Sequence, residues 1–230
     1  ICTMSLILLL PILSKELNHK AGYEAQLYKN RLTFNELVLG IRQSMFNPSA
    51  FAAIIFMLFA NIGYGIFDVI YNEFYIKELG WNGEEIGLMR PYGMWLGGLI
   101  GLSAGLMTLY FRKRSLLLFF VIGQAVVFLT ASTLSYETSN LLTSAVLIGV
   151  DAVDAGWSVL IFSILMALCI TQTSATNFGI FMGFGNISML IGNNIAPAIL
   201  GSGDFTFAFI FAALTLIPCL ISGYYLTKET

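Results

Sequence analysis

The amino-acid sequence predicts an all-α membrane protein with six transmembrane helices, and three observations carry this prediction. Of the 230 residues, 57% are apolar and only 10% are charged, whereas soluble domains contain about 25% charged residues. The mean hydropathy is +0.82. Long apolar stretches alternate with short polar gaps along most of the chain. These observations exclude a disordered chain, a nucleic-acid-binding protein and an ordinary soluble enzyme, and they imply a lipid bilayer as the protein's surroundings.

The first 48 residues differ in composition from the rest of the chain. Residues 1–13 are apolar but shorter than the ~20 residues that a spanning helix needs, so we interpret them as the end of a truncated transmembrane helix and expect the chain to be a fragment. Residues 14–48 are polar and basic, and we expect a cytoplasmic linker. Within it, Thr33 and Glu36 form a predicted capping box before apolar residues at helical spacing. This pattern predicts an amphipathic helix, which lies either on the membrane surface or on protein.

Residues 49–230 are expected to form a six-helix unit, and Asn47-Pro48 predict the start of its first helix. Each apolar stretch is long enough to cross a bilayer; the expected limits are 49–76, 84–110, 115–134, 140–170, 176–200 and 205–226. The loop at 111–114 is basic, and the other loops with charge are acidic. The positive-inside rule then places the linker 14–48, the basic loop and the C-terminus in the cytoplasm. Six helices entered from a basic linker are typical of the second half of a twelve-helix transporter, whose N-terminal six-helix half is absent from this chain.

Ionisable residues inside a membrane are costly and are therefore candidates for function. At ~1.5 Å per residue, Asp68 is expected about 12 Å, and Arg90 about 9 Å, below the outer ends of consecutive helices. We predict an ion pair between Arg90 and either Asp68 or Glu73, with Asp68 as the deeper candidate. The pair is either an outer gate that breaks and re-forms or a static pair that neutralises Arg90.

Asp151 and Asp154 share one face of the fourth predicted span, near the middle of the membrane. Two carboxylates in a medium of low dielectric constant repel each other, so at least one is expected to hold a proton near neutral pH. The two aspartates are candidates for a proton-coupling site or for a structural hydrogen-bonded pair. No Lys or Arg is expected at their depth within this chain, so a partner is expected in the absent half or on the substrate.

Uncharged residues supply further candidates. Residues that either line a polar cavity or join helices are Asn61, Asn72, Gln124, Asn186, Asn193, Asn194 and Trp157. Glycines at regular spacing predict faces where helices approach closely or slide; these are Gly93, Gly97, Gly101, Gly105, Gly179 and Gly183. Pro197 and Pro218 are expected to bend their helices. The sequence contains no nucleotide-binding loop, nucleophile motif or metal-ligand cluster, so we expect no enzymatic activity, no metal and no cofactor.

Two segments resemble a known family. One is the helix end at Met166, followed by Ser174-Ala175-Thr176-Asn177-Phe178; the other is the helix junction from Phe74 to Gly87. They resemble the C-terminal half of major facilitator transporters, specifically the AmpG-type muropeptide permeases and their acetyl-CoA transporter relatives. The resemblance covers essentially the whole chain. Arg112-Lys113-Arg114 departs from the family's loop motif, which carries an Asp before its basic cluster.

The resemblance implies a major facilitator fold in a bacterial inner membrane, with the proton gradient as its energy source. It implies proton symport of a small molecule, with anhydro-muropeptides as the cargo, by alternating access. The alternatives are the same fold with another cargo, such as a coenzyme A thioester, a siderophore or a drug, and a non-transporting scaffold or truncated relic.

Overall fold

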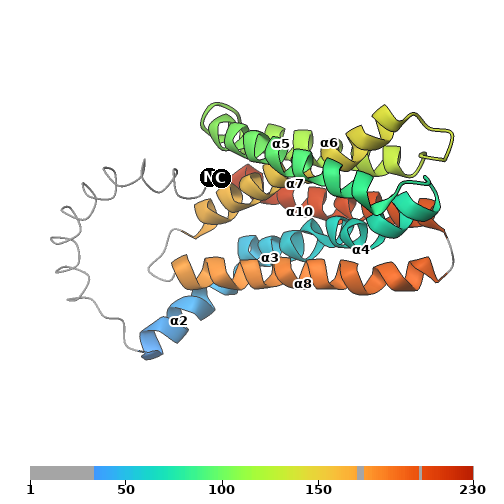
Figure 1. Ribbon diagram of the computed structural model, residues 1–230. Coiled ribbons are helices and arrows are strands. Elements are labelled where there is room, and N and C mark those ends of the chain that lie inside the picture. Colours follow the sequence, from blue (N-terminus) through green and yellow to red (C-terminus); the bar gives the residue numbers. More distant parts are fainter. Residues whose placement is uncertain (1–33, 170–173, 202–203, 230) are drawn as a thin grey trace. The chain divides into compact units, whose positions relative to one another are not determined.

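The computed structural model describes residues 34–169, 174–201 and 204–229, and every element within them is a helix (Figure 1). The chain divides into two units, residues 1–42 and Gln43–Thr230. Helix α2 (Phe34–Met45) confirms the helix predicted after Thr33. The predicted truncated helix at 1–13, the linker up to residue 33 and the Thr33 cap lie outside the described residues.

The predicted helix start at Asn47-Pro48 is confirmed. Helix α3 (Pro48–Ala60) has Pro48 in its first position, and the Asn47 Oδ1 accepts a hydrogen bond from the Ala50 N–H at 2.7 Å. An asparagine cap satisfies a donor that has no partner within the helix, and proline is suited to a position whose N–H would be free in any case.

The first predicted span, 49–76, consists of two helices rather than one. Helix α3 ends at Ala60, and after Asn61 the chain continues as α4 (Ile62–Lys77). The backbone N–H of Asn61 donates to the Ser188 Oγ at 3.0 Å, and the Trp157 indole N–H donates to the carbonyl oxygen of Ala60 at 3.2 Å. Irregular backbone at membrane depth is tolerated where neighbouring helices satisfy its polar groups in this way.

The next four predicted helices begin and end within three residues of their expected limits. They are α5 (Gly83–Tyr110), α6 (Lys113–Ala131), α7 (Asn140–Leu168) and α8 (Ser174–Leu200). Helix α8 is continuous through Pro197. The last predicted helix is instead interrupted at Thr215, between α9 (Phe205–Leu214) and α10 (Leu216–Glu229). Pro218 explains this break, because it has no N–H to donate to the carbonyl four residues earlier.

Five segments of the described chain are long and apolar enough to cross a membrane; they are Pro48–Lys77, Gly83–Tyr110, Lys113–Ala131, Asn140–Leu168 and Phe205–Lys228. This finding is consistent with a multi-pass membrane protein. The remaining expected span, 176–200, corresponds to α8 and has sufficient length at 27 residues. It is not among these five segments, because its four asparagines and four glycines lower its mean hydropathy.

Within the second unit, successive spans run antiparallel, so α5 is parallel to α7 and α4 is parallel to α8. Helix α5 packs on α7, α4 on α8, and α3 on α10, while α6 contacts α7, α9 and α10. The C-terminal ends of α4, α6 and α8 lie at one end of the bundle, and those of α5, α7 and α10 lie at the other (Figure 1). By the bounds of the helices, the first end carries Glu78, Glu84, Glu85, Glu137 and Asp204 together with Lys77, and the second carries Arg112, Lys113, Arg114 and Lys228. The bundle therefore separates acidic from basic connections.

Glycines set the closest helix contacts, although not all at the predicted positions. On α5, a Cβ added to Gly93 or Gly97 would lie 3.1 Å from a side-chain atom of α7, as the predicted packing face requires. Gly101 and Gly105 have only ordinary van der Waals contacts with that helix. On α8, a Cβ added to Gly179 or Gly183 would meet no atom within 4 Å, so the described helices do not pack on these two glycines. Gly192 of the same helix does make a close contact, because a Cβ on it would lie 2.3 Å from the Ile62 carbonyl oxygen.

Candidate functional site

Arg90 of α5 binds carboxylates from two other helices. Its Nη2 donates to the Asp68 Oδ1 of α4 at 2.8 Å, and its Nε lies 3.3 Å from the Asp151 Oδ2 of α7. The guanidinium carbon also lies 4.1 Å from the centroid of the Tyr71 ring, which is a cation–π contact. The predicted pairing of Arg90 with Asp68 is thus present. We call Asp68, Arg90 and Asp151 the arginine cluster.

The partner of Asp151 corrects the expectation that no cation of this chain lies at its depth. The rise of a helix gives the depth of each Cα atom, but an arginine side chain extends several ångströms from its own Cα. Arg90 also precedes Gly93, whose missing side chain lets α5 approach Asp151 closely. The long side chain and the close approach together bring the guanidinium to a carboxylate on a helix that is not its neighbour in sequence.

Glu73 does not belong to the arginine cluster. It forms an ion pair with Lys77, one turn further along α4, and both side chains are well exposed. Ion pairs at this spacing on an exposed helix face contribute roughly 0.3–0.5 kcal/mol to stability. Asp68 is therefore the α4 carboxylate that binds Arg90, because its side chain lies on the face that α5 covers.

Tyr64 completes the surroundings of Asp151. Its hydroxyl donates to the Asp151 Oδ1 at 3.2 Å. The Asp151 Oδ2 is buried without a hydrogen bond, so the charge of Arg90 compensates it. Tyr64 and Tyr71 were not predicted as partners of this cluster. They lie four residues before and three residues after Asp68, which is the spacing of one helical face and the signal that identifies them.

Asp154 has different partners from Asp151, although both aspartates lie on one face of α7. The Gln124 Nε2 donates to the Asp154 Oδ1 at 3.4 Å. Within the described chain, no Lys or Arg lies within ion-pair distance of Asp154, whereas Asp151 has Arg90. Gln124 is 2% exposed, and its Oε1 has no hydrogen-bond partner. Arg90 thus compensates the charge of Asp151, whereas Asp154 has the hydrogen bond from Gln124.

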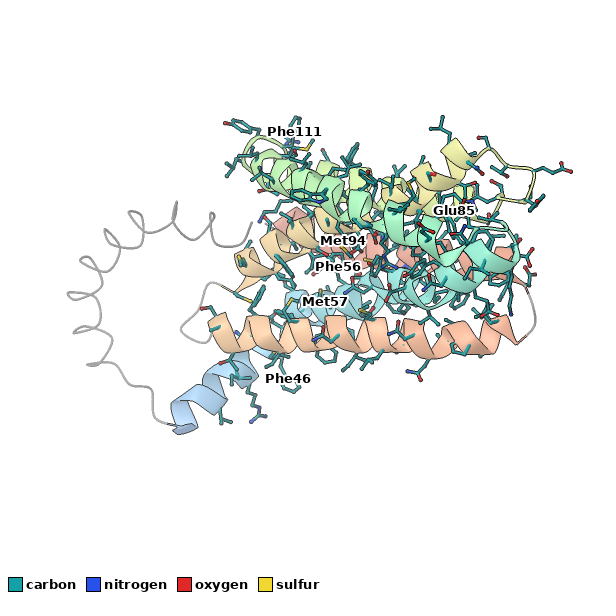
Figure 2. The ribbon with its side chains drawn as sticks, in the orientation of Figure 1. Phe46, Phe56, Met57, Glu85, Met94 and Phe111 are labelled. Atoms are coloured by element: carbon teal, nitrogen blue, oxygen red, sulfur yellow. The ribbon has the colours of Figure 1, made fainter. Side chains whose placement is uncertain are left out.

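Asp151 and Asp154 both line a groove of about 650 Å³ between α5 and α7. Its other lining residues are Met94, Gly97, Gly98, Gly101, Leu102, Ala155 and Val159. Three of the α5 residues are glycines, so the wall facing the aspartates carries little side-chain volume. Figure 2 shows the α5 side chain of Met94 near the middle of the bundle, between Glu85 and Phe111 at the two ends of that helix. The groove is therefore placed along the middle of α5.

The remaining polar candidates lie apart from the arginine cluster. Asn61 marks the break between α3 and α4, and its Nδ2 donates to the Gly185 carbonyl oxygen at 3.4 Å. Asn193 lies against Gly65, with its amide nitrogen placed to donate to the Gly65 carbonyl at 2.9 Å. Both asparagines therefore join α8 to the first span.

Exposure and burial separate the last candidates. Asn72, Asn186 and Asn194 are exposed, and Asn194 bonds the Leu190 carbonyl of its own helix at 2.7 Å. Trp157 is fully buried, so its role is to hold the backbone at Ala60 rather than to line a cavity. Of the seven polar candidates, only Gln124 contacts one of the aspartates.

The described residues contain no group of three or more His, Cys, Asp or Glu side chains placed to hold a metal ion. What they do contain is a partly buried cation that binds carboxylates of two helices, and a groove with a further acid that has no cation beside it. This arrangement is suited to binding or moving charge within a helical bundle. No protein-family model matches this chain, and a search of the curated proteins finds no match.

Proposed function

We propose that this chain is the C-terminal half of a proton-coupled secondary transporter that works by alternating access. The observation that carries the proposal is the arginine cluster, in which one partly buried cation is shared by α4 and α7 beside a groove lined by a further acid. Buried ionisable residues are expensive in a membrane protein and commonly mark pathways for ions or substrates.

The shared arginine is suited to a gate because it can exchange partners. Breaking a buried pair is strongly destabilising when a charge is left alone. Arg90 has two carboxylates, so it keeps one when it loses the other. The Asp68 side chain is 35% exposed and that of Asp151 is 7% exposed, so Asp68 is the more accessible of the two carboxylates. Release of Asp68 would let α4 and α5 separate while α5 stays bound to α7.

We also propose a partner for open positions on α5 and α8. A Cβ added to Gly98 of α5 or Gly183 of α8 would meet nothing within 4 Å, and Asn186 of α8 is exposed. An exposed amide is costly against lipid, and small residues favour helix packing. A second group of helices, the proposed N-terminal half, would cover these positions. The same proposal places the basic end of the bundle in the cytoplasm and the acidic end outside.

The proposed cargo is an anhydro-muropeptide, imported across a bacterial inner membrane. This cargo is supported by the sequence resemblance, and the geometry supports the transport mechanism. The alternatives are another solute on the same fold, or a scaffold without transport. A scaffold has no need of an unpaired acid in an open groove, so the position of Asp154 favours a transporter.

Uptake of labelled anhydro-muropeptide into vesicles that contain the full-length protein tests the proposal. We expect uptake to require a proton gradient, to stop when an uncoupler is added and to be lost in Asp151→Asn and Asp154→Asn. Glu137→Gln, in the exposed connection between α6 and α7, is the matched control and should transport normally. Uptake that continues with an uncoupler would contradict proton coupling. Absence of uptake by a folded, inserted protein would exclude this cargo, and uptake of a coenzyme A thioester or siderophore would identify the alternative.

A further inference from the structure

Asp151 and Asp154 have different partners, and this difference indicates separate roles for the two acids. We propose that Asp154 is the residue that takes up and releases the coupled proton, that Gln124 positions it, and that Asp151 stays a carboxylate bound to Arg90. This inference rests on the proposed transport function and specifies which acid in the groove carries the proton. Three features support it: the charges around Asp154, the amide of Gln124 and the access that the groove provides.

The cationic side chains on the helices around Asp154 have other partners. On α5, Arg90 already binds Asp68 and Asp151. On α6, Lys113 donates to the Ser163 carbonyl of α7, which is nine residues, or about 13 Å, along that helix from Asp154. On α4, the ionisable groups nearest the site are Tyr64 and Asp68. Neither α3 (Pro48–Ala60) nor α8 (Ser174–Leu200) contains a charged residue.

The consequence is a local excess of negative charge. The arginine cluster holds two carboxylates and one guanidinium, so it is already one negative charge in excess before Asp154 is counted. A further carboxylate one helical turn away, without a cation beside it, is stabilised by taking up a proton. Asp151 has the opposite circumstances, because it has both a guanidinium and the Tyr64 hydroxyl as partners.

Gln124 is suited to both protonation states of Asp154. A glutamine amide has a donor nitrogen and an acceptor oxygen that exchange places by a half-turn of the side-chain end. When Asp154 is ionised, the Gln124 Nε2 donates to its Oδ1, as observed at 3.4 Å. When Asp154 is protonated, its hydroxyl can donate to the Gln124 Oε1, which is now buried without a partner. A residue with only a donor or only an acceptor would serve one state alone.

The groove provides the route for the proton. Asp154 is one of its lining residues, and the opposite wall contains Gly97, Gly98 and Gly101. These glycines have no side chains to close the groove over the carboxyl group. Water or cargo that enters the groove would therefore reach Asp154 directly. Proton exchange by Asp154 needs no movement of the arginine cluster.

Infrared difference titration of the full-length protein in lipid tests the assignment without cargo. We expect the carbonyl band of a protonated carboxyl group, shifted by ¹³C-aspartate labelling, to be lost in Asp154→Asn and to persist in Asp151→Asn. Gln124→Leu should shift the frequency of the band, because the hydrogen bond to the carboxyl group is removed. Asp154→Glu keeps an acid at this position and should retain a shifted band. This variant therefore distinguishes loss of the acid from misfolding as the cause of a missing band in Asp154→Asn.

A transport measurement completes the test. Asp154→Asn should lose accumulation driven by a pH gradient but retain exchange of labelled for unlabelled cargo, because exchange needs no net proton movement. A band that persists in Asp154→Asn and disappears in Asp151→Asn would overturn the assignment, even if the wild-type protein transports. Failure of the wild-type protein to accumulate any cargo overturns the proposed function instead, and the uptake assay shows that failure independently of the infrared band.

Discussion

The Arg90 Nε lies 3.3 Å from the Asp151 Oδ2, although the two residues belong to helices that are not consecutive in the chain. This contact links α5 to α7 by charge, in addition to the close approach at Gly93 and Gly97. The same guanidinium binds Asp68 of α4 at 2.8 Å. One side chain therefore connects three helices.

Arg90→Gln is expected to destabilise the protein strongly, because two carboxylates lose their common cation. Removal of one member of a buried pair costs about 3–5 kcal/mol, and the 35% exposure of Asp68 places the expected loss near the lower limit. Thermal unfolding in detergent measures the loss. Lys77→Gln, which removes the cation of the exposed pair with Glu73, is the matched control and should change stability by less than about 1 kcal/mol.

The triple variant Arg90→Gln with Asp68→Asn and Asp151→Asn distinguishes lost charge compensation from lost packing. Replacing an entire buried ionic group by neutral residues is often close to neutral for stability. The triple variant should therefore unfold at a higher temperature than Arg90→Gln alone. A triple variant less stable than the single one would show that the carboxylates do not depend on Arg90.

Two glycines of α8 should respond in opposite ways to alanine. In Gly192→Ala, the new Cβ would lie 2.3 Å from the Ile62 carbonyl oxygen and 3.0 Å from the Ile66 nitrogen. The helices must separate, so we expect a loss of about 2 kcal/mol or more. In Gly183→Ala, the Cβ meets nothing within 4 Å, and the better helix propensity of alanine should leave stability unchanged or raise it by up to about 1 kcal/mol. Unfolding temperatures of both variants in detergent test the pair, and equal effects would contradict the close contact of α4 and α8.

Trp157→Phe should destabilise the break between α3 and α4. The change removes the indole N–H that binds the Ala60 carbonyl oxygen at 3.2 Å, and a buried acceptor without a donor costs about 1–3 kcal/mol. Trp95→Phe, at a side chain that is 63% exposed, is the control and should have little effect. Unfolding temperatures of both variants in detergent measure the difference.

Cysteine labelling tests the proposed orientation. In a background with Cys2, Cys169 and Cys219 replaced by Ser, Glu137→Cys should react with a membrane-impermeant maleimide on intact cells. Arg112→Cys should react only after the cells are permeabilised. The reverse result would invert the proposed orientation. Labelling of both positions on intact cells would contradict a membrane crossing by α6.

The ion pair of Arg90 with Asp68 was predictable from the sequence because it joins consecutive antiparallel helices. On such helices, the distance of each residue from the shared loop gives its depth directly. Asp151 belongs to a helix that packs on α5 only after the chain has folded, so no count along the sequence pairs it with Arg90. The charge separation of the connections was predictable for the same reason as the ion pair, because helices that reverse direction at each connection sort those connections to alternate ends.

The break at Asn61 was not predictable, because its cause lies elsewhere in the chain. Asn72 and Asn186 also lie within apolar stretches, and both stand inside unbroken helices. Asn61 differs in the neighbours that α7 and α8 place beside it, namely Trp157 and Ser188. The break at Thr215 had a local signal in Pro218, and the sequence located that distortion to within one helical turn.

The joint at Asn61 also bears on how the protein fits bilayers of different thickness. The segment Pro48–Lys77 has 30 residues, which as one straight helix would extend about 45 Å, well beyond a hydrocarbon core of about 30 Å. A single rigid rod of that length adapts to a thinner or thicker bilayer by tilting as a whole. Two shorter rods joined at Asn61 can adapt by moving at that joint, while α4 keeps its contacts with α8. Hydrophobic mismatch would then act on the junction between the rods before it disturbs the packing around Arg90.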